Sequence, residues 1–129
     1  MAVIVIVDDD PTVRLIASEL LRQDNHAVVE AGDGDEALRV IASLPVDLVV
    51  LDMLMPNRDG LETIGELRRL RPEIKILAIS SGGRVGADNL LRTAMVLGAD
   101  DTLVKPLRLE TFSRSVARLL SLSPGSAVA

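Results

Sequence analysis

Residues 3–11 read VIVIVDDDP, five aliphatic residues followed by three aspartates and a proline. All five aliphatic residues are β-branched, which is typical of a parallel strand buried on both faces. Asp10 before Pro11 has the pattern of a helix N-cap followed by the first helical residue. The stretch therefore predicts a buried strand that runs into a helix and leaves Asp8 and Asp9 at the junction.

Length and composition narrow the possible functions. The chain has 129 residues, a net charge of −5, no cysteine and a single aromatic residue, Phe112. This length predicts one domain, and the lack of cysteine excludes disulfides and thiolate metal sites. The negative charge and the scarcity of aromatic residues argue against a direct nucleic-acid partner. The aliphatic runs are too short for a membrane span, and Asp8 interrupts the one candidate for a signal-peptide core, so we expect a cytoplasmic protein.

Short apolar runs alternate with amphipathic segments along the chain. The predicted strands are Val3–Val7, Ala27–Val29, Val46–Leu51, Ile74–Ile79 and Thr102–Val104. Apolar residues recur at helical spacing between these runs, and Gly98 is a helix stop. The alternation predicts an α/β fold: a doubly wound, five-stranded parallel sheet of flavodoxin-like order 2-1-3-4-5, with helices on both faces. We expect this domain to cover residues 2–122 and residues 123–129 to form a flexible tail.

Polar residues occupy the predicted carboxyl ends of four strands. These residues are Asp8, Asp9, Asp10, Asp52, Ser80 and Lys105. In a parallel sheet all carboxyl ends lie along one side, and ligands bind there beside the point where the strand order reverses. The second predicted strand offers only Glu30 and Ala31 and lies at the border of the sheet. We therefore expect carboxylates, a hydroxyl and an amine to converge at the other four strand ends.

Such a cluster of carboxylates predicts a bound cation. Two carboxylates about 4 Å apart repel by roughly 4 kcal/mol at an effective dielectric constant near 20. A cation removes this repulsion, and ligands that are all oxygen favour Mg²⁺, Mn²⁺ or Ca²⁺. Mg²⁺ commonly shares its coordination shell with a substrate phosphate, so a site that receives a phosphoryl group is expected.

Four stretches carry a family resemblance. They read VDDDPTVR, VVLDMLMPNRDG, LAISSGG and GADDTLVKPL. In order and spacing they resemble the signature stretches of the receiver domain of two-component response regulators, and the resemblance extends from Val3 to about Leu122. It implies a single-domain response regulator that signals by changing conformation. Such a protein is a phosphoacceptor and not an enzyme, because it assists only its own phosphorylation and dephosphorylation.

The resemblance also implies the partners and the metal ligands. Asp52 is the implied phosphoacceptor, and the donor is a phosphohistidine of a histidine kinase or a histidine phosphotransfer protein. Asp9, Asp52 and the backbone carbonyl of Leu54 are the implied direct ligands of Mg²⁺, while Asp8 acts largely through a metal-bound water. The downstream partner is a protein that the sequence does not identify.

Lys105 and Ser80 are the residues implied to contact the phosphoryl oxygens. Phosphoryl transfer depends on positioning and charge neutralisation more than on covalent chemistry, which fits a lysine and a hydroxyl beside a metal. The family usually has a cis peptide bond where Lys105–Pro106 stands.

Two other functions compete with this interpretation. The run VIVIVDDDPT also fits a haloacid-dehalogenase-like phosphatase with Asp8 as nucleophile and Asp10 as acid/base. In that family the acidic pair follows the lysine, whereas Asp100 and Asp101 precede Lys105, where we expect only a solvated loop. The third possibility is a degenerate receiver that acts only as a docking module, against which the full set of site residues argues.

The chain departs from the family at the positions that transmit the switch. Thr102 stands where many receivers have tyrosine or phenylalanine, and Leu107 replaces the aromatic residue that commonly follows Lys-Pro. A threonine cannot sweep out the volume of a ring. We therefore predict that phosphorylation reshapes the glycine-rich loop Ser80–Gly86, with Thr102 a minor follower.

Overall fold

The computed structural model describes residues 2–54, 60–81 and 87–122. Its strands are β1 (Val3–Val7), β2 (Ala27–Ala31), β3 (Leu48–Asp52), β4 (Lys75–Ser81) and β5 (Asp101–Lys105). Its helices are α1 (Pro11–Gln23), α2 (Gly34–Ser43), α3 (Gly60–Leu70), α4 (Ala87–Leu97) and α5 (Leu109–Ser121). Strands and helices alternate strictly in the described residues, as the sequence predicted.

All neighbouring strands of the sheet are parallel, in the order β2-β1-β3-β4-β5. This order confirms the predicted flavodoxin-like topology. The register pairs Val7 with Leu51, and Asp52 with Ile79. The last residues of β4 and β5, Ser81 and Lys105, also pair with each other. Four strands therefore end close together, at the carboxyl side of the sheet.

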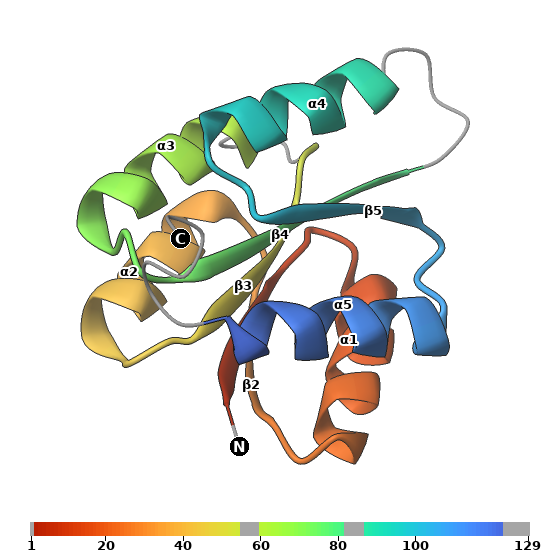
Figure 1. Ribbon diagram of the computed structural model, residues 1–129. Helices are drawn as coiled ribbons and strands as arrows, with labels where there is room; N and C mark the ends of the chain where they lie inside the picture. The colour runs from red at the N-terminus through yellow and green to blue at the C-terminus, as the bar shows by residue number, and fades with distance from the viewer. Residues whose placement is uncertain (1, 55–59, 82–86, 123–129) are drawn as a thin grey trace.

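Helices cover both faces of the sheet, and each face has its own apolar core. Figure 1 shows α1 and α5 on one side of the sheet and α3 and α4 on the other. Phe112 and Leu21 pack into the core on the α1 and α5 side, while Ile41, Ile64 and Leu67 pack into the core on the α2, α3 and α4 side. Strand β3 is buried along its whole length, because it lies in the middle of the sheet between both layers.

The junction between β1 and α1 forms as the sequence predicted. Asp10 has extended backbone angles, and its side chain accepts a hydrogen bond of 2.9 Å from the Thr12 N–H. Pro11 follows as the first helical residue, where its missing N–H costs nothing. Gly98, after α4, has a φ of +128°, which favours glycine, so this helix stop is also confirmed.

Strand β2 is longer than the predicted segment. It continues through Glu30 to Ala31, because its backbone pairs with β1 as far as Val7. Glutamate has a low preference for strands, so a sequence pattern ends the segment early. The extension places Glu30 within the sheet, opposite Ile6.

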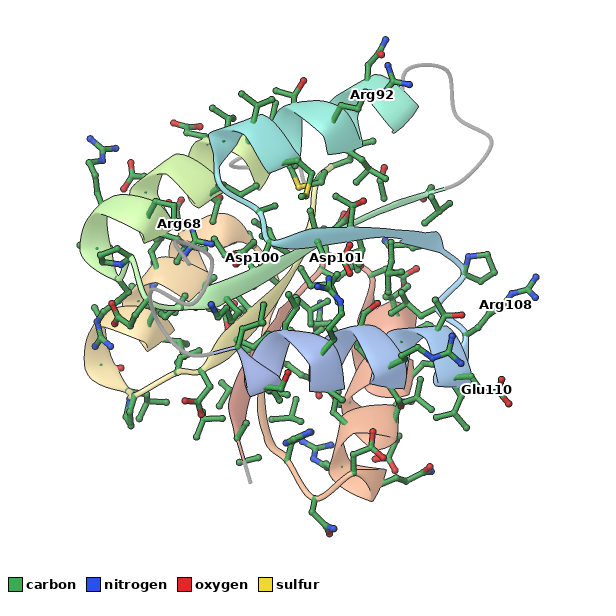
Figure 2. All side chains as sticks on the ribbon, viewed as in Figure 1. Arg68, Arg92, Asp100, Asp101, Arg108 and Glu110 are labelled. Carbon is green, nitrogen blue, oxygen red and sulfur yellow. The ribbon has the colours of Figure 1, made fainter. Side chains whose placement is uncertain are left out.

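The prediction of a solvated loop at Asp100 and Asp101 is wrong. Asp100 Oδ2 accepts hydrogen bonds from the Ile76 N–H at 2.8 Å and from Arg68 Nη2 at 2.6 Å. Asp101 is the first residue of β5 and pairs with Arg118 at 2.8 Å. Figure 2 shows Arg68 on α3 and Asp100 beside the start of β5. Both aspartates therefore anchor secondary structure.

Within residues 2–54, 60–81 and 87–122, no helix is both long enough and apolar enough to cross a membrane.

Candidate functional site

Three carboxylates meet at the carboxyl side of the sheet. Asp8 follows β1, Asp9 is its neighbour, and Asp52 ends β3. One oxygen from each of the three lies within 4.8 Å of the others. Asp8 and Asp52 are buried, with exposed fractions of 0% and 4%, whereas Asp9 is exposed. The structure therefore brings together the three predicted metal ligands that are side chains.

Asp8 is held on several sides by hydrogen bonds. Its N–H donates to the Ala31 carbonyl at 3.1 Å, and its Oδ1 accepts from the Asp10 N–H at 2.9 Å. Its carbonyl oxygen accepts a 2.6 Å hydrogen bond from Arg14 Nη1. Ala31 and Arg14 thus hold the backbone of Asp8, while the Asp10 N–H and Lys105 contact its carboxylate.

Lys105 supplies positive charge to the cluster. Its Nζ lies 2.7 Å from Asp8 Oδ2 and 3.5 Å from Asp52 Oδ2, and its side chain is largely buried. Burial by itself would lower the pKa of Lys105, but contact with Asp8 and attraction to Asp52 outweigh it and raise the pKa. The ammonium therefore stays protonated. The bond between Lys105 and Pro106 is cis, as the family resemblance implied.

Asp52 has an unusual ionisation equilibrium. Burial, together with repulsion from Asp8 and a smaller repulsion from Asp9, raises the pKa of Asp52 to about 6. Attraction to Lys105 and the 3.2 Å hydrogen bond from the Leu54 N–H act in the opposite direction. Ionisation of Asp52 at neutral pH therefore lowers the free energy of unfolding of the metal-free protein.

We expect this effect to appear as a pH-dependent stability. Because the pKa of Asp52 is raised in the folded state, the native protein binds more protons than the unfolded chain between about pH 4 and pH 6. The contribution of Asp52 to the free energy of unfolding should therefore fall as pH rises through this window. In metal-free protein, Asp52→Asn should be about as stable as wild type at pH 4 and about 2–3 kcal/mol more stable at pH 7.

Urea denaturation at several pH values measures this difference. Asp24→Asn is a suitable control, because Asp24 is exposed and lies just after α1, at the opposite end from the cluster. A stability gain between pH 4 and pH 7 that appears in Asp52→Asn and not in this control belongs to position 52. A pH-independent difference for Asp52→Asn would contradict the raised pKa.

Two buried oxygens test whether a cation and a phosphoryl group fit here. Ser80 is 1% exposed, and its Oγ has no hydrogen-bond partner among the described residues. Asp8 Oδ2 likewise has no aligned donor in that part of the chain, although Lys105 is close. Within the part of the chain that the structure describes, three carboxylates face the single ammonium of Lys105, so the cluster carries an excess of negative charge. An all-oxygen set with this charge suits a hard divalent cation, so the residues fit the predicted metal.

Some predictions remain untested by the geometry. The Leu54 carbonyl is still only a predicted ligand, although its N–H contacts Asp52. The loop Ser80–Gly86 lies outside the described residues from 82 onward. The Asp10 carboxylate caps α1 by accepting from the Thr12 N–H. The phosphatase alternative needs this carboxylate as an acid/base, so the cap argues against it.

Thr102 lies on β5, next to α4. It is half-buried, and its N–H donates to the Asp101 side chain at 2.8 Å. It lines a groove of about 300 Å³ together with Leu91, Arg92 and Val104. Figure 2 shows Arg92 projecting outward from α4. Thr102 thus borders a surface groove between α4 and β5.

Two residues near the site had no role in the sequence interpretation. Arg14, on α1, contacts the Asp8 carbonyl, and its Nε lies 3.2 Å from Glu30 Oε1 on β2. The predicted end of β2 before Glu30 hid this connection. No local signal in the sequence marks it, because Arg14 reaches Asp8 and Glu30 only through the packing of α1 against β1 and β2.

The comparisons with known proteins agree on one family. The profile of the response regulator receiver domain matches residues 4–117. The probable transcriptional regulator ycf27 of Cyanophora paradoxa is 40% identical over 118 residues, which are 89% of this chain and 48% of that protein. The response regulator MprA of Mycolicibacterium vanbaalenii is also 40% identical over 118 residues, 91% of this chain and 49% of that protein. The chain thus spans about half the length of these curated relatives.

Solved structures give the same result. The receiver domain of NtrX from Brucella abortus is 29% identical, with a TM-score of 0.87 over 93% of this chain and 99% of that one. The response regulator TrrA from Thermotoga maritima, solved in complex with Mg²⁺-BeF, is 31% identical, with a TM-score of 0.80 over 92% of this chain and 99% of that one. Sequence, fold and acidic site therefore place this chain in the response regulator receiver domain family, a family of signalling phosphoacceptor domains.

Proposed function

We propose that this chain accepts a phosphoryl group on Asp52 from a histidine kinase or a histidine phosphotransfer protein and then signals to a partner protein. The observation that carries the proposal is the placement of a buried carboxylate between two further carboxylates and a lysine. The family membership supports the kinase as donor. The proposal treats residues 2–122 as the working domain, and output is by binding a protein or by passing the phosphoryl group onward.

The metal part of the proposal assigns Mg²⁺ to the three carboxylates. Asp9 and Asp52 would hold the ion directly with the Leu54 carbonyl, and Asp8 would hold it through a water molecule. When bound, Mg²⁺ supplies positive charge to the phosphoryl oxygens. The complex of the related TrrA with Mg²⁺-BeF supports this assignment.

The proposed chemistry is an in-line displacement at phosphorus. A carboxylate oxygen of Asp52 attacks the phosphohistidine, a P–O bond forms, and the P–N bond breaks. The imidazole nitrogen leaves with the electron pair of that bond and then takes up a proton. Lys105 pairs with one phosphoryl oxygen, and the buried Ser80 hydroxyl donates a hydrogen bond to another. Both groups are preorganised, because they lie at the ends of packed strands.

The alternatives have less support. A phosphatase with Asp8 as nucleophile leaves Asp52 without a role and needs Asp10, which caps α1, as acid/base. A degenerate docking module would not need Lys105 and Ser80 beside the acids.

Phosphotransfer from purified histidine kinases tests the proposal. Each kinase of the host is first autophosphorylated with radiolabelled ATP and then mixed with this protein in Mg²⁺ buffer. We expect one kinase or phosphotransfer protein to transfer its label within minutes, and EDTA to prevent the transfer. If neither a kinase nor a small phosphodonor labels the protein, the docking alternative replaces the proposal.

A further inference from the structure

Arg14 connects the acidic site to a strand that contributes no ligand. Its Nη1 donates a 2.6 Å hydrogen bond to the Asp8 carbonyl, and its Nε donates to Glu30 Oε1 at 3.2 Å. The Arg14 side chain is 21% exposed and that of Glu30 36%. Among the described residues, the Arg14 guanidinium bonds to the Asp8 carbonyl and to Glu30, so its influence on the site passes through the backbone of Asp8.

We propose that Arg14, held by Glu30, is a positioning residue for the divalent-cation site. The inference rests on the metal site of the proposed function. The carbonyl that Arg14 contacts belongs to the peptide unit that joins Asp8 to Asp9. Rotation of this peptide would turn the two carboxylates relative to each other. The arginine therefore fixes the relative orientation of the two adjacent ligands.

The neighbouring hydrogen bonds show why this one contact matters. On one side of the peptide, the Asp8 N–H is held by the Ala31 carbonyl; on the other, the Asp10 N–H is held by Asp8 Oδ1. The Asp8 carbonyl has a side-chain partner instead, and Arg14 alone provides it among the described residues. Because a charged donor makes this bond, it is stronger than a neutral one. Glu30 accepts from Nε of the same guanidinium, which favours the orientation that reaches the Asp8 carbonyl.

A purely electrostatic role makes a different prediction. A cation near a metal site repels the metal, so removal of the Arg14 charge would tighten binding, and removal of the Glu30 charge would weaken it. Positioning predicts that both substitutions weaken binding, because either one releases the peptide between Asp8 and Asp9. The sign of the effect of Arg14→Gln therefore separates the two roles.

Mn²⁺ is a suitable probe, because it binds the same oxygen ligands as Mg²⁺. The concentration of free Mn²⁺ is measured by electron paramagnetic resonance. The chain has no tryptophan or tyrosine, so intrinsic fluorescence offers little signal. We expect Arg14→Gln and Glu30→Gln each to weaken Mn²⁺ binding by about tenfold, the range of outer-shell partners of metal ligands. Arg14→Lys should weaken it as well, because one ammonium cannot replace the two-pronged guanidinium.

Arg22→Gln is the matched control. Arg22 lies on the same helix but pairs only weakly with Glu19, at 3.7 Å. This variant loses the same charge but leaves the contact with the Asp8 carbonyl in place. Its Mn²⁺ affinity should therefore stay within about twofold of wild type, because exposed charges are screened by salt. Arg14→Gln with wild-type or tighter affinity overturns the proposal.

A second readout separates positioning from general destabilisation. In metal-free protein, the Asp10 amide should exchange faster in Arg14→Gln, while amides in β3 keep their wild-type rates. Faster exchange at all amides, or an unchanged exchange rate of the Asp10 amide, overturns the positioning role. If Arg14→Gln fails to fold, the exchange rates of Glu30→Gln are judged by the same criteria. A wild-type protein that does not bind Mn²⁺ contradicts the proposed metal site, whereas wild-type binding with unaltered variants contradicts the role of Arg14 alone.

Discussion

Asp52→Asn is expected to remove phosphoryl labelling almost completely, by more than about a hundredfold, under conditions in which wild type is labelled. The reason is chemical: an amide lacks the negative charge of the nucleophile and cannot form a stable acyl phosphate. The fold should survive, because asparagine has nearly the same shape and removes a buried charge. Loss of labelling would thus not reflect unfolding.

The measurement combines labelling with mapping of the modified residue. Protein is incubated with Mg²⁺ and acetyl phosphate, reduced with borohydride to convert an acyl phosphate to homoserine, and digested for mass spectrometry. In wild type the modification should fall on Asp52 alone. Label that persists in Asp52→Asn but disappears in Asp8→Asn would contradict the receiver assignment and favour the phosphatase alternative.

The site residues at the carboxyl ends of the strands were the easiest to predict from the sequence. Asp8, Asp52 and Lys105 follow β-branched runs, and a parallel sheet allows only one side for the carboxyl ends of its strands. Once the strand order is known, the register places these residues together without any knowledge of side-chain packing. The acidic cluster was therefore predictable from pattern and topology.

Contacts made by long polar side chains were not predictable in the same way. Arg14 reaches Asp8 and Glu30 only because α1 packs across β1 and β2. Arg68 reaches Asp100 only because α3 packs beside α4, whose C-terminal end leads to Asp100. Such contacts depend on the crossing of packed elements, which no local periodicity encodes. Sequence patterns accordingly assign these arginines to the surface, where long charged residues usually lie.

Asp9→Ala is expected to abolish Mg²⁺-dependent phosphorylation while leaving the fold intact. Asp9 is the exposed member of the cluster, so its removal creates no cavity in the core. It also removes one of three mutually repelling carboxylates, so the melting temperature in metal-free buffer should stay the same or rise. The acidic set then retains only Asp8 and Asp52, which favours weaker binding of a hard divalent cation.

Asp10→Asn is the matched control for this substitution. It removes the same charge from the adjacent residue, yet asparagine caps helices as well as aspartate, so the hydrogen bond to the Thr12 N–H should persist. Initial labelling rates are measured for both variants over a series of Mg²⁺ concentrations. Asp10→Asn should follow the wild-type curve, and Asp9→Ala should show no Mg²⁺-dependent rate. Unchanged labelling of Asp9→Ala, or equal loss in both variants, would contradict the assignment, because the effect would then come from net charge instead of from a ligand to the metal.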